Sequence, residues 1–406
     1  MRVAVTKQSF LRMRKIELGT VTIGPRSKTY LLDVLKSKRL SYGKYCRAFE
    51  KKFAKLHSRK YALVVNSGTD ALRIALHALK IKHKWIDGDE VLVPALTFVA
   101  SVNVILQLNL KPVLVDVLPT SYNLDPEKLE ASISKKTKAI MVVHLFGQSA
   151  DMTAIMKIAR KHNLKIIEDS CETMFATHKG RAVGSWGEAG CFSTYSAHLI
   201  ASGVGGIIIT NNKSTSILCR SLANHGRHHS YLSLEDDDNL KNTRLAQMVS
   251  RRFEYEHIGY SSRLTELEAA VALDQLENYE RIIKPRQKNG SYLLKLLSPF
   301  EKFIALPYPV LGNTHVYMVF PITVVDKRIK RNDLVLHLEK NGIETRYLLP
   351  LLGQKIYASL KWNSKKYPAA SELTQNGFYI GIHQDLKKQD LKYVAQKFSE
   401  FFAAYV

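Results

Sequence analysis

The chain has 406 residues, of which 46% are hydrophobic and 24% charged, and its formal net charge is +24. This is globular composition, and the length exceeds the roughly 250–300 residues at which one hydrophobic core stops growing, so we expect two domains. No apolar run approaches the roughly 20 residues of a membrane-spanning helix, and Met1–Lys15 mixes charges without the apolar stretch of a signal peptide. We therefore expect a cytoplasmic protein with no membrane partner.

From about residue 60 to residue 211, short β-branched runs alternate with helical patterns. Strands are predicted for Tyr61–Asn66, Glu90–Pro94, Pro112–Val117, Lys138–Phe146, Lys165–Glu168, Gly190–Tyr195 and Gly206–Thr210, with helices opening near Thr69 and Phe98. Asp151–His162 is amphipathic, and Asp151 can cap it. This alternation predicts an α/β fold with a largely parallel sheet covered by helices on both faces. Such sheets bind ligands at the carboxyl ends of their strands.

The remainder of the chain predicts a second, smaller unit. Tyr231–Asn242 is expected to be an exposed acidic loop, and Ser262–Tyr279 a long helix. After about Pro285 the pattern changes to a smaller α/β unit, with strands near Val316–Val324 and Glu344–Tyr347. We therefore divide the chain into a large domain over residues 1–280, with an N-terminal arm over 1–58, and a C-terminal domain over 281–406.

Two polar turns at strand ends are candidates for binding phosphate. Ser67-Gly68-Thr69 links a strand to a helix, whose free amides and positive dipole end favour an anion, and glycine lets the backbone approach closely. Ser193, at the end of another strand, could complete this site. The same Ser-Gly-Thr pattern is also typical of a simple helix cap.

Asp169 and Phe98 are candidates for holding an aromatic cofactor ring. A carboxylate at the end of a buried strand needs a partner, and a pyridinium nitrogen would serve, as would an ordinary cap or ion pair. Phe98 offers a ring face for stacking or for core packing.

In this order, these motifs resemble the DegT/DnrJ/EryC1/StrS family of nucleotide-sugar aminotransferases, pyridoxal-phosphate (PLP) enzymes of fold type I. The likeness runs from about residue 20 to the C-terminus and is carried by Asn66–Leu72, Pro94–Phe98, Val142–Gly147, Ile167–Glu172, Phe192-Ser193, Gly203–Gly206, Asn224–Gly226 and Gly259–Glu266. It implies a large domain with a mostly parallel sheet and a smaller C-terminal α/β domain. It also implies that Ser67, Gly68, Thr69 and Ser193 hold the cofactor phosphate, that Phe98 stacks on the ring, and that Asp169 pairs with the ring nitrogen.

Two departures from the family pattern change the expected chemistry. His198 stands where the family has its Schiff-base lysine, and Glu172 stands where it usually has glutamine. The two changes occur together in PLP-dependent 3-dehydratases of nucleotide-linked 4-keto-6-deoxyhexoses, such as GDP-4-keto-6-deoxymannose 3-dehydratase. The resemblance therefore implies that His198 acts as acid and base in the loss of the 3-hydroxyl, because an imidazole titrates near neutral pH and forms no stable covalent link to the cofactor. PLP or pyridoxamine phosphate (PMP) would bind non-covalently, with glutamate as amino donor.

Other features keep two further hypotheses open. Ile343–Gln354 is more similar to the tail of the aminotransferases, and Ser261 replaces an asparagine that often reaches the partner's phosphate. A nucleotide-sugar aminotransferase is therefore the second hypothesis, and a non-catalytic sensor or binding protein on the same fold the third. The substrate contacts implied are Arg346, His383 within Gly377–Gln384 (a segment that could equally be a buried strand), and His225, which would reach the neighbouring subunit's site.

The resemblance also implies partners and a biological setting. It predicts a homodimer with shared active sites and a nucleotide-diphosphate-sugar substrate, in deoxysugar or lipopolysaccharide O-antigen biosynthesis. The high positive charge is typical of a solvated basic surface, and it would also steer such an anion. Nucleic acid is not expected, because the basic residues are spread along the whole chain without a recognition motif. The four cysteines, at positions 46, 171, 191 and 219, include no Cys-x-x-Cys pair. We expect reduced thiols, no metal site and no iron–sulfur cluster.

Overall fold

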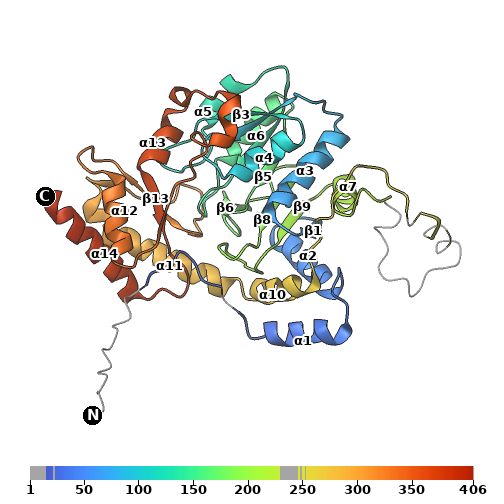
Figure 1. Ribbon diagram of the computed structural model, residues 1–406, viewed down its shortest axis with the longest axis horizontal. Coiled ribbons are helices and arrows are strands. Elements are labelled where there is room, and N and C mark those ends of the chain that lie inside the picture. Colours follow the sequence, from blue (N-terminus) through green and yellow to red (C-terminus); the bar gives the residue numbers. More distant parts are fainter. Residues whose placement is uncertain (1–14, 22, 229–245, 247–248, 252, 406) are drawn as a thin grey trace, which may run out of the picture.

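A computed structural model describes residues 15–21, 23–228, 246, 249–251 and 253–405 (Figure 1). The expected acidic loop at Tyr231–Asn242 lies outside the described residues, as does nearly all of Met1–Lys15. The described chain contains a seven-stranded sheet, a four-stranded sheet and a two-stranded pair. Helices pack around them, and the expected α/β fold is confirmed.

The seven-stranded sheet carries the strands predicted between residues 60 and 211. Its order is β1 (Tyr61–Val65), β9 (Gly206–Thr210), β8 (Ala189–Ser193), β5 (Lys165–Asp169), β4 (Thr137–Val143), β2 (Glu90–Pro94) and β3 (Lys111–Val115). From β8 to β3 all neighbours are parallel, whereas β9 runs antiparallel to both β1 and β8. No helix separates β8 from β9 in the chain, so β9 returns directly beside β8. The prediction of a largely parallel sheet is therefore confirmed, with β9 as its exception.

Helices cover both faces of this sheet because its strands are apolar on both faces. Val91 and Val93 of β2 belong to the core that includes α3 (Gly68–Lys82) and α4 (Val99–Gln107). Leu92, between them, belongs to a second core with α6 (Met152–Lys161). Successive side chains of a strand point to opposite faces, so each strand fills both cores. Asp151 caps α6 as predicted, accepting a hydrogen bond from the amide of Ala154.

The remaining elements of this half pack around the seven-stranded sheet. They are α1 (Ser27–Ser37), α2 (Lys44–Leu56), α5 (Pro126–Leu129), α7 (Lys213–Ala223) and α10 (Glu266–Glu277), with the short pair β6 (Thr177–His178) and β7 (Arg181–Ala182). The helix predicted for Ser262–Tyr279 begins later, as α10, because the Thr265 side chain caps it by accepting a hydrogen bond from the amide of Leu267.

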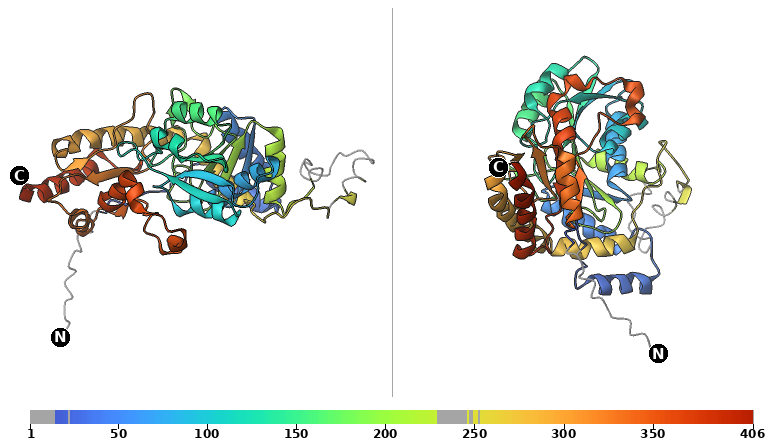
Figure 2. Two further views of the ribbon diagram at one scale, coloured as in Figure 1. Left: turned by 90° about the horizontal axis from the view of Figure 1, so that it is seen from above. Right: turned by 60° about the vertical axis from the view of Figure 1, so that its left-hand side comes forward.

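The C-terminal elements form an antiparallel sheet with its own core. Its order is β10 (Ile304–Ala305), β11 (Phe320–Val324), β13 (Gly377–Ile380) and β12 (Thr345–Tyr347), packed with α11 (Glu280–Leu297), α12 (Arg331–Lys340), α13 (Pro368–Asn376) and α14 (Lys388–Phe402). The core is rich in phenylalanine, including Phe320, Phe378 and Phe398. Figure 2 shows α12 and α14 at the end of the molecule opposite α7. The domain boundary expected near residue 280 falls between α10 and α11 and stays a prediction.

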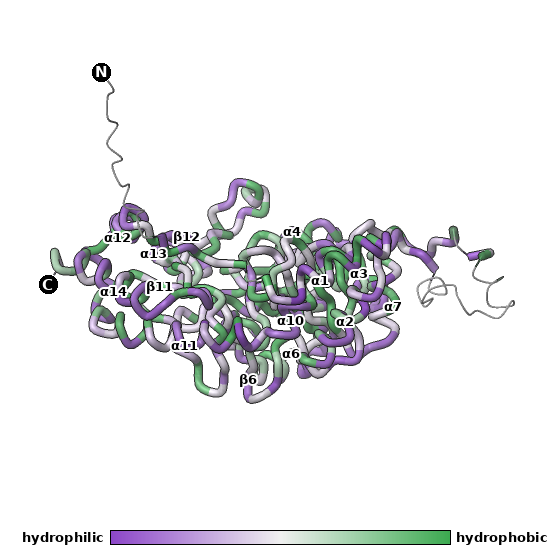
Figure 3. Tube along the Cα trace, turned by 90° about the horizontal axis from the view of Figure 1, so that it is seen from below, coloured by the Kyte–Doolittle hydropathy of each residue, from purple (hydrophilic) through white to green (hydrophobic). Residues whose placement is uncertain are grey.

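Hydrophobic and hydrophilic stretches alternate along the whole described chain (Figure 3). No helix in its described part combines the length and the apolar character needed to cross a membrane.

Candidate active site

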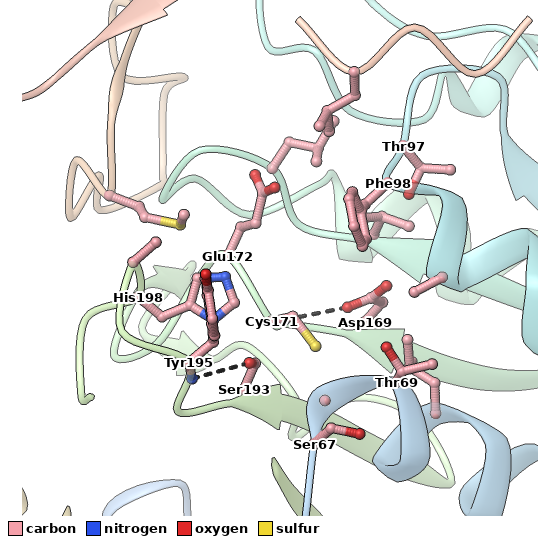
Figure 4. A pocket seen from close by; sticks show the side chains of 18 of the residues that line it. Ser67, Thr69, Thr97, Phe98, Asp169, Cys171, Glu172, Ser193, Tyr195 and His198 are labelled. Carbon is pink, nitrogen blue, oxygen red and sulfur yellow. Dashed lines mark hydrogen bonds between the residues drawn. The ribbon is translucent and has the colours of Figure 1, made fainter. Parts of the chain in front are cut away.

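A cavity of about 430 Å³ lies where the parallel strands end (Figure 4). Every residue that we expected to bind the cofactor or to act in catalysis lines it: Ser67, Gly68, Thr69, Phe98, Asp169, Glu172, Ser193 and His198. Met318, Leu349 and Tyr379 from the C-terminal half complete the wall. The sheet therefore positions its ligand site as parallel sheets do, at the carboxyl ends of the strands.

The turn between β1 and α3 packs closely against the end of β8. The Ser67 side chain caps α3 by accepting a hydrogen bond from the amide of Asp70 at 3.1 Å. A Cβ on Gly68 would lie 2.7 Å from the Ser193 Cβ and 2.8 Å from the Cys171 Sγ, so only glycine fits there. This contact brings three hydroxyl groups, those of Ser67, Thr69 and Ser193, to one end of the cavity beside a helix N-terminus. That donor set fits a phosphate group.

Asp169 ends β5 as a buried carboxylate. Its Oδ2 accepts a hydrogen bond from the Ser101 hydroxyl at 2.8 Å, and its Oδ1 accepts one from the Cys171 amide at 3.2 Å. Burial raises the pKa of Asp169, and no described cationic side chain pairs with it. A protonated ring nitrogen would supply the missing positive charge, so the site fits a pyridine cofactor.

Phe98 immediately precedes α4 and leaves 56% of its surface exposed although it lines the cavity. In Figure 4 its ring lies above Asp169. A cavity aromatic with an uncovered face is suited to stacking on a flat ligand.

His198 lies in the loop between β8 and β9, beside Tyr195. Its backbone amide donates a hydrogen bond to the Tyr195 carbonyl at 2.9 Å, and the two rings meet edge to face with centroids 6.0 Å apart. The His198 Nδ1 is buried and has no hydrogen-bond partner among the described residues. Burial lowers the pKa of His198 to about 4. The imidazole is therefore neutral at pH 7 and able to accept a proton.

Glu172 shows the opposite shift. Burial raises its pKa to about 7, aided by the negative charge of Asp169, although the Phe146 amide donates a hydrogen bond to the carboxylate at 3.3 Å. Glu172 in turn contributes to the raised pKa of Tyr379, which burial brings to about 12. At neutral pH the cavity therefore contains a partly protonated carboxyl group, that of Glu172, and a neutral imidazole, that of His198.

The three expected substrate residues do not line the cavity of their own chain. His225 is exposed, and its amide donates to the Tyr260 carbonyl at 2.7 Å. Arg346 is exposed on β12, opposite Tyr379 in the strand pairing. His383 is 7% exposed and sits near Arg286. For His383 the burial has a physical reason, since it lies just beyond β13 against the C-terminal core. Substrate contact by these residues stays a prediction.

Several cavity residues were missed by sequence reasoning. Thr97, Cys171, Tyr195, Met318, Leu349 and Tyr379 all line it. Tyr195 is 54% exposed, and its only signal in the sequence was its position three residues before His198. Tyr379 lies within Gly377–Gln384, a segment expected either to line the sugar pocket or to form a buried strand; Gly377–Ile380 forms β13, and Tyr379 lines the cavity.

Metal ligation has no candidate here. Across residues 15–405, apart from the gaps given above, no three His, Cys, Asp or Glu side chains are grouped to hold a metal ion. The four cysteines are free thiols, with Cys171 partly buried and the other three buried.

The sequence profile of the DegT/DnrJ/EryC1/StrS aminotransferase family matches residues 21–399. The chain belongs to this family. Its relatives within the family share nearly its full length. A pleiotropic regulatory protein from Geobacillus stearothermophilus is 33% identical, covering 93% of this chain and 95% of the relative. A GDP-perosamine synthase from Caulobacter vibrioides is 32% identical, again covering 93% and 95%.

Solved structures of the DegT/DnrJ/EryC1/StrS family and its neighbours share the fold. A histidine-to-asparagine mutant of GDP-4-keto-6-deoxymannose-3-dehydratase (ColD), with bound GDP-perosamine, superposes with a TM-score of 0.86 at 26% identity, covering 94% of this chain and all of that one. The chain is thus a PLP fold-type I protein of a family of sugar enzymes.

Proposed function

We propose that the protein is a PLP/PMP-dependent dehydratase that removes the 3-hydroxyl of a nucleotide-linked 4-keto-6-deoxyhexose. The observation that carries this proposal is that His198, which by the resemblance stands at the family's lysine position, lines the cavity with a buried Nδ1. A solved relative that bears the name of such a 3-dehydratase supports it. When bound, the cofactor supplies an amine for the sugar ketone and an electron-accepting ring.

The chain's own residues divide the binding work. Ser67, Thr69 and Ser193 would hold the phosphate, Phe98 would cover one ring face, and Asp169 would keep the ring nitrogen protonated. None of these contacts is covalent, so the cofactor would be retained by hydrogen bonds, charge and stacking alone. Cofactor affinity should therefore depend on each of these residues more than it does where a lysine holds the ring.

His198 would move the protons. Its neutral imidazole would accept the proton lost from the cofactor's C4′ carbon, and the imidazolium would deliver that proton to the 3-hydroxyl, which leaves as water. A low pKa of His198 weakens the imidazole as the base of the first transfer and strengthens the imidazolium as the acid of the second. Glu172, with a pKa of about 7, is the neighbouring group able to exchange a proton at neutral pH.

The first test replaces the imidazole by a group that cannot carry a proton. His198→Asn should lower the rate at which the 3-oxygen is lost by at least about 10²-fold, because a positioned acid–base group contributes roughly that much. It should leave the affinity for PMP near that of the wild type. Mass spectrometry of products from GDP-, CDP- and dTDP-4-keto-6-deoxy sugars, with PLP and glutamate, measures the first effect, and cofactor fluorescence the second. His162→Asn, outside the cavity, is the matched control. Undiminished dehydration by the His198 variant would remove that residue from the mechanism.

An aminotransferase is the second candidate. It is favoured by the relatives called GDP-perosamine synthase and by the tail over Ile343–Gln354. The same product analysis separates the two, because transamination retains the 3-oxygen and converts the ketone to an amine. A regulatory protein without catalysis, as the name of one relative suggests, would turn over neither class of substrate.

We also propose that the protein works as a homodimer with shared sites. Two apolar side chains, Phe253 and Ile258, are 82% and 90% exposed on the segment that pairs with His225-Gly226. Large apolar groups exposed together mark an interaction surface. A second copy covering this segment would carry His225 toward a neighbouring cavity.

A further inference from the structure

The Asp169 carboxylate is held by a second pair of hydroxyl groups. Ser101 lies in the first turn of α4, and its Oγ is 2.8 Å from the Asp169 Oδ2. Thr97, which lines the cavity, has its Oγ1 2.8 Å from the same Ser101 Oγ. The three side chains therefore form a line that runs from the cavity wall to the carboxylate.

The donors in this line have one consistent direction. An ionised carboxylate only accepts, so the Ser101 proton points to Asp169. Ser101 has no second proton to give, and Thr97 must therefore donate to Ser101. Both hydroxyl groups thus stabilise the negative charge of Asp169, the Ser101 hydroxyl directly and the Thr97 hydroxyl through Ser101. Hydrogen bonds connected in this way strengthen each other.

The protein buries this line of side chains. Ser101 is fully buried, Thr97 is 1% exposed and Asp169 is 5% exposed. Removing the Ser101 hydroxyl would leave Oδ2 without its donor, and buried charged groups are the ones most penalised by a lost hydrogen bond.

The other titratable groups that face Asp169 act on it unequally. Cys171 in the following loop also favours ionised Asp169, through its thiol and its amide, but a thiol is a weaker donor than the Ser101 hydroxyl. Burial raises the thiol pKa values of Cys171 and of Cys191 on β8, so both thiols are neutral. Glu172 opposes ionisation of Asp169, because the two carboxylates would carry like charges. His144, after β4, favours it, but its Nε2 is directed to the Glu168 carboxylate at 3.1 Å.

We propose that Ser101, supported by Thr97, is a positioning residue that keeps Asp169 ionised and oriented for a cofactor ring nitrogen. The line ties this function to α4, the same helix turn that carries Phe98. One helix end would then set both the ring face and the ring nitrogen's counter-charge. The inference rests on the proposed role of Asp169 and holds for either reaction discussed above.

Cofactor binding as a function of pH provides the test. The full-length protein is stripped of cofactor, and the Kd of PLP and of PMP is measured by fluorescence from pH 5 to pH 9. Ser101→Ala should weaken binding about tenfold at neutral pH, as expected for a lost hydrogen bond to a charged group. It should also move the acidic midpoint of binding to higher pH, because the pKa of Asp169 rises further without the donor. Thr97→Val should move it in the same direction by less.

Two controls separate positioning from structural damage. Ser101→Thr keeps the hydroxyl and should restore both affinity and midpoint. Ser221→Ala removes a buried hydroxyl of α7 that donates to the Arg227 carbonyl and does not line the cavity, and it should leave the midpoint unchanged. If Ser101→Ala weakens binding equally at every pH, or does not weaken it, the inference is wrong.

The failure of this inference differs from a failure of the proposed cofactor site. Asp169→Asn should remove the contribution of Asp169 to the acidic midpoint, leaving those of Glu172 and of the cofactor phosphate, and should weaken binding strongly. An Asp169→Asn variant that binds like wild type would overturn the role of Asp169 itself. Loss of binding in that variant, with no midpoint shift in Ser101→Ala, would overturn only the role of Ser101.

Discussion

At the scale of single residues, burial sets the protonation states in and around the cavity. It lowers the pKa of His198 to about 4 and raises that of Glu172 to about 7, which reverses the usual order of imidazole and carboxyl group. Pairs of groups whose pKa values are driven apart identify which one accepts and which one donates a proton. Here the neutral imidazole is the acceptor, which agrees with the role proposed for His198.

A buried histidine outside the cavity should make the fold sensitive to acid. His57 stacks on Phe53 with ring centroids 4.3 Å apart, and burial lowers its pKa to about 4. The unfolded chain binds the proton below about pH 6.5 and the folded chain only below about 4, so stability falls as pH falls through that window, by up to about 1.4 kcal/mol per pH unit. His57→Phe should reduce this slope. Urea unfolding at pH 4.5, 5.5, 6.5 and 7.5 measures it; an unchanged slope would contradict the assignment.

At the scale of elements, the site depends on how closely the β1–α3 turn approaches β8. Alanine at Gly68 would push the turn away from Ser193 and Cys171, since its Cβ would stand 2.7 and 2.8 Å from them. We expect Gly68→Ala to cost about 1–3 kcal/mol of stability, as overpacking does, and to weaken PLP binding. Gly353→Ala, whose Cβ meets nothing within 4 Å, should do neither. Thermal unfolding and cofactor titration compare the two, and equal effects would show that the close approach is unimportant.

The elements also show what a sequence can predict. Local signals sufficed for strands such as β2, and for the cap of α6, because strand apolarity and capping depend on neighbouring residues. The motif order brought His198, Asp169 and Ser67 to one cavity. The direction of β9 and the contribution of Tyr379 depend instead on contacts between distant segments, for which the sequence carries no local signal. The C-terminal sheet supplies Tyr379 through its packing against Phe146, with ring centroids 5.9 Å apart.

At the scale of the whole molecule, the proposed dimer explains why an expected substrate residue lies outside the cavity of its own chain. The cavity lies between the seven-stranded sheet and residues of the C-terminal half, while His225 is exposed and does not line it. This segment packs closely on the chain that follows residue 253: a Cβ on Gly226 would clash with the His257 carbonyl at 1.8 Å, and one on Gly259 with the Gly226 amide at 2.2 Å. The exposed apolar side chains beside this contact are suited to packing against a second copy.

Mixed dimers test this arrangement directly. In a two-fold dimer with shared sites, each site combines His198 of one protomer with His225 of the other. His198→Asn and His225→Ala homodimers should both lose activity. Mixing them under conditions of subunit exchange should restore about a quarter of wild-type activity, because half of the dimers are mixed and one of their two sites is intact.

The activity restored on mixing distinguishes the possible arrangements, because each arrangement predicts a different value. If each site used only its own chain, every site in the mixture would carry one substitution and no activity would return. If His225 were unimportant, its homodimer would already be active. Light scattering must first show a dimer, and Phe253→Glu with Ile258→Glu should shift it to monomer, since two buried charges would oppose an apolar contact. A dimer that survives both charges would place the interface elsewhere, while the mixing experiment would still report whether His225 acts across it.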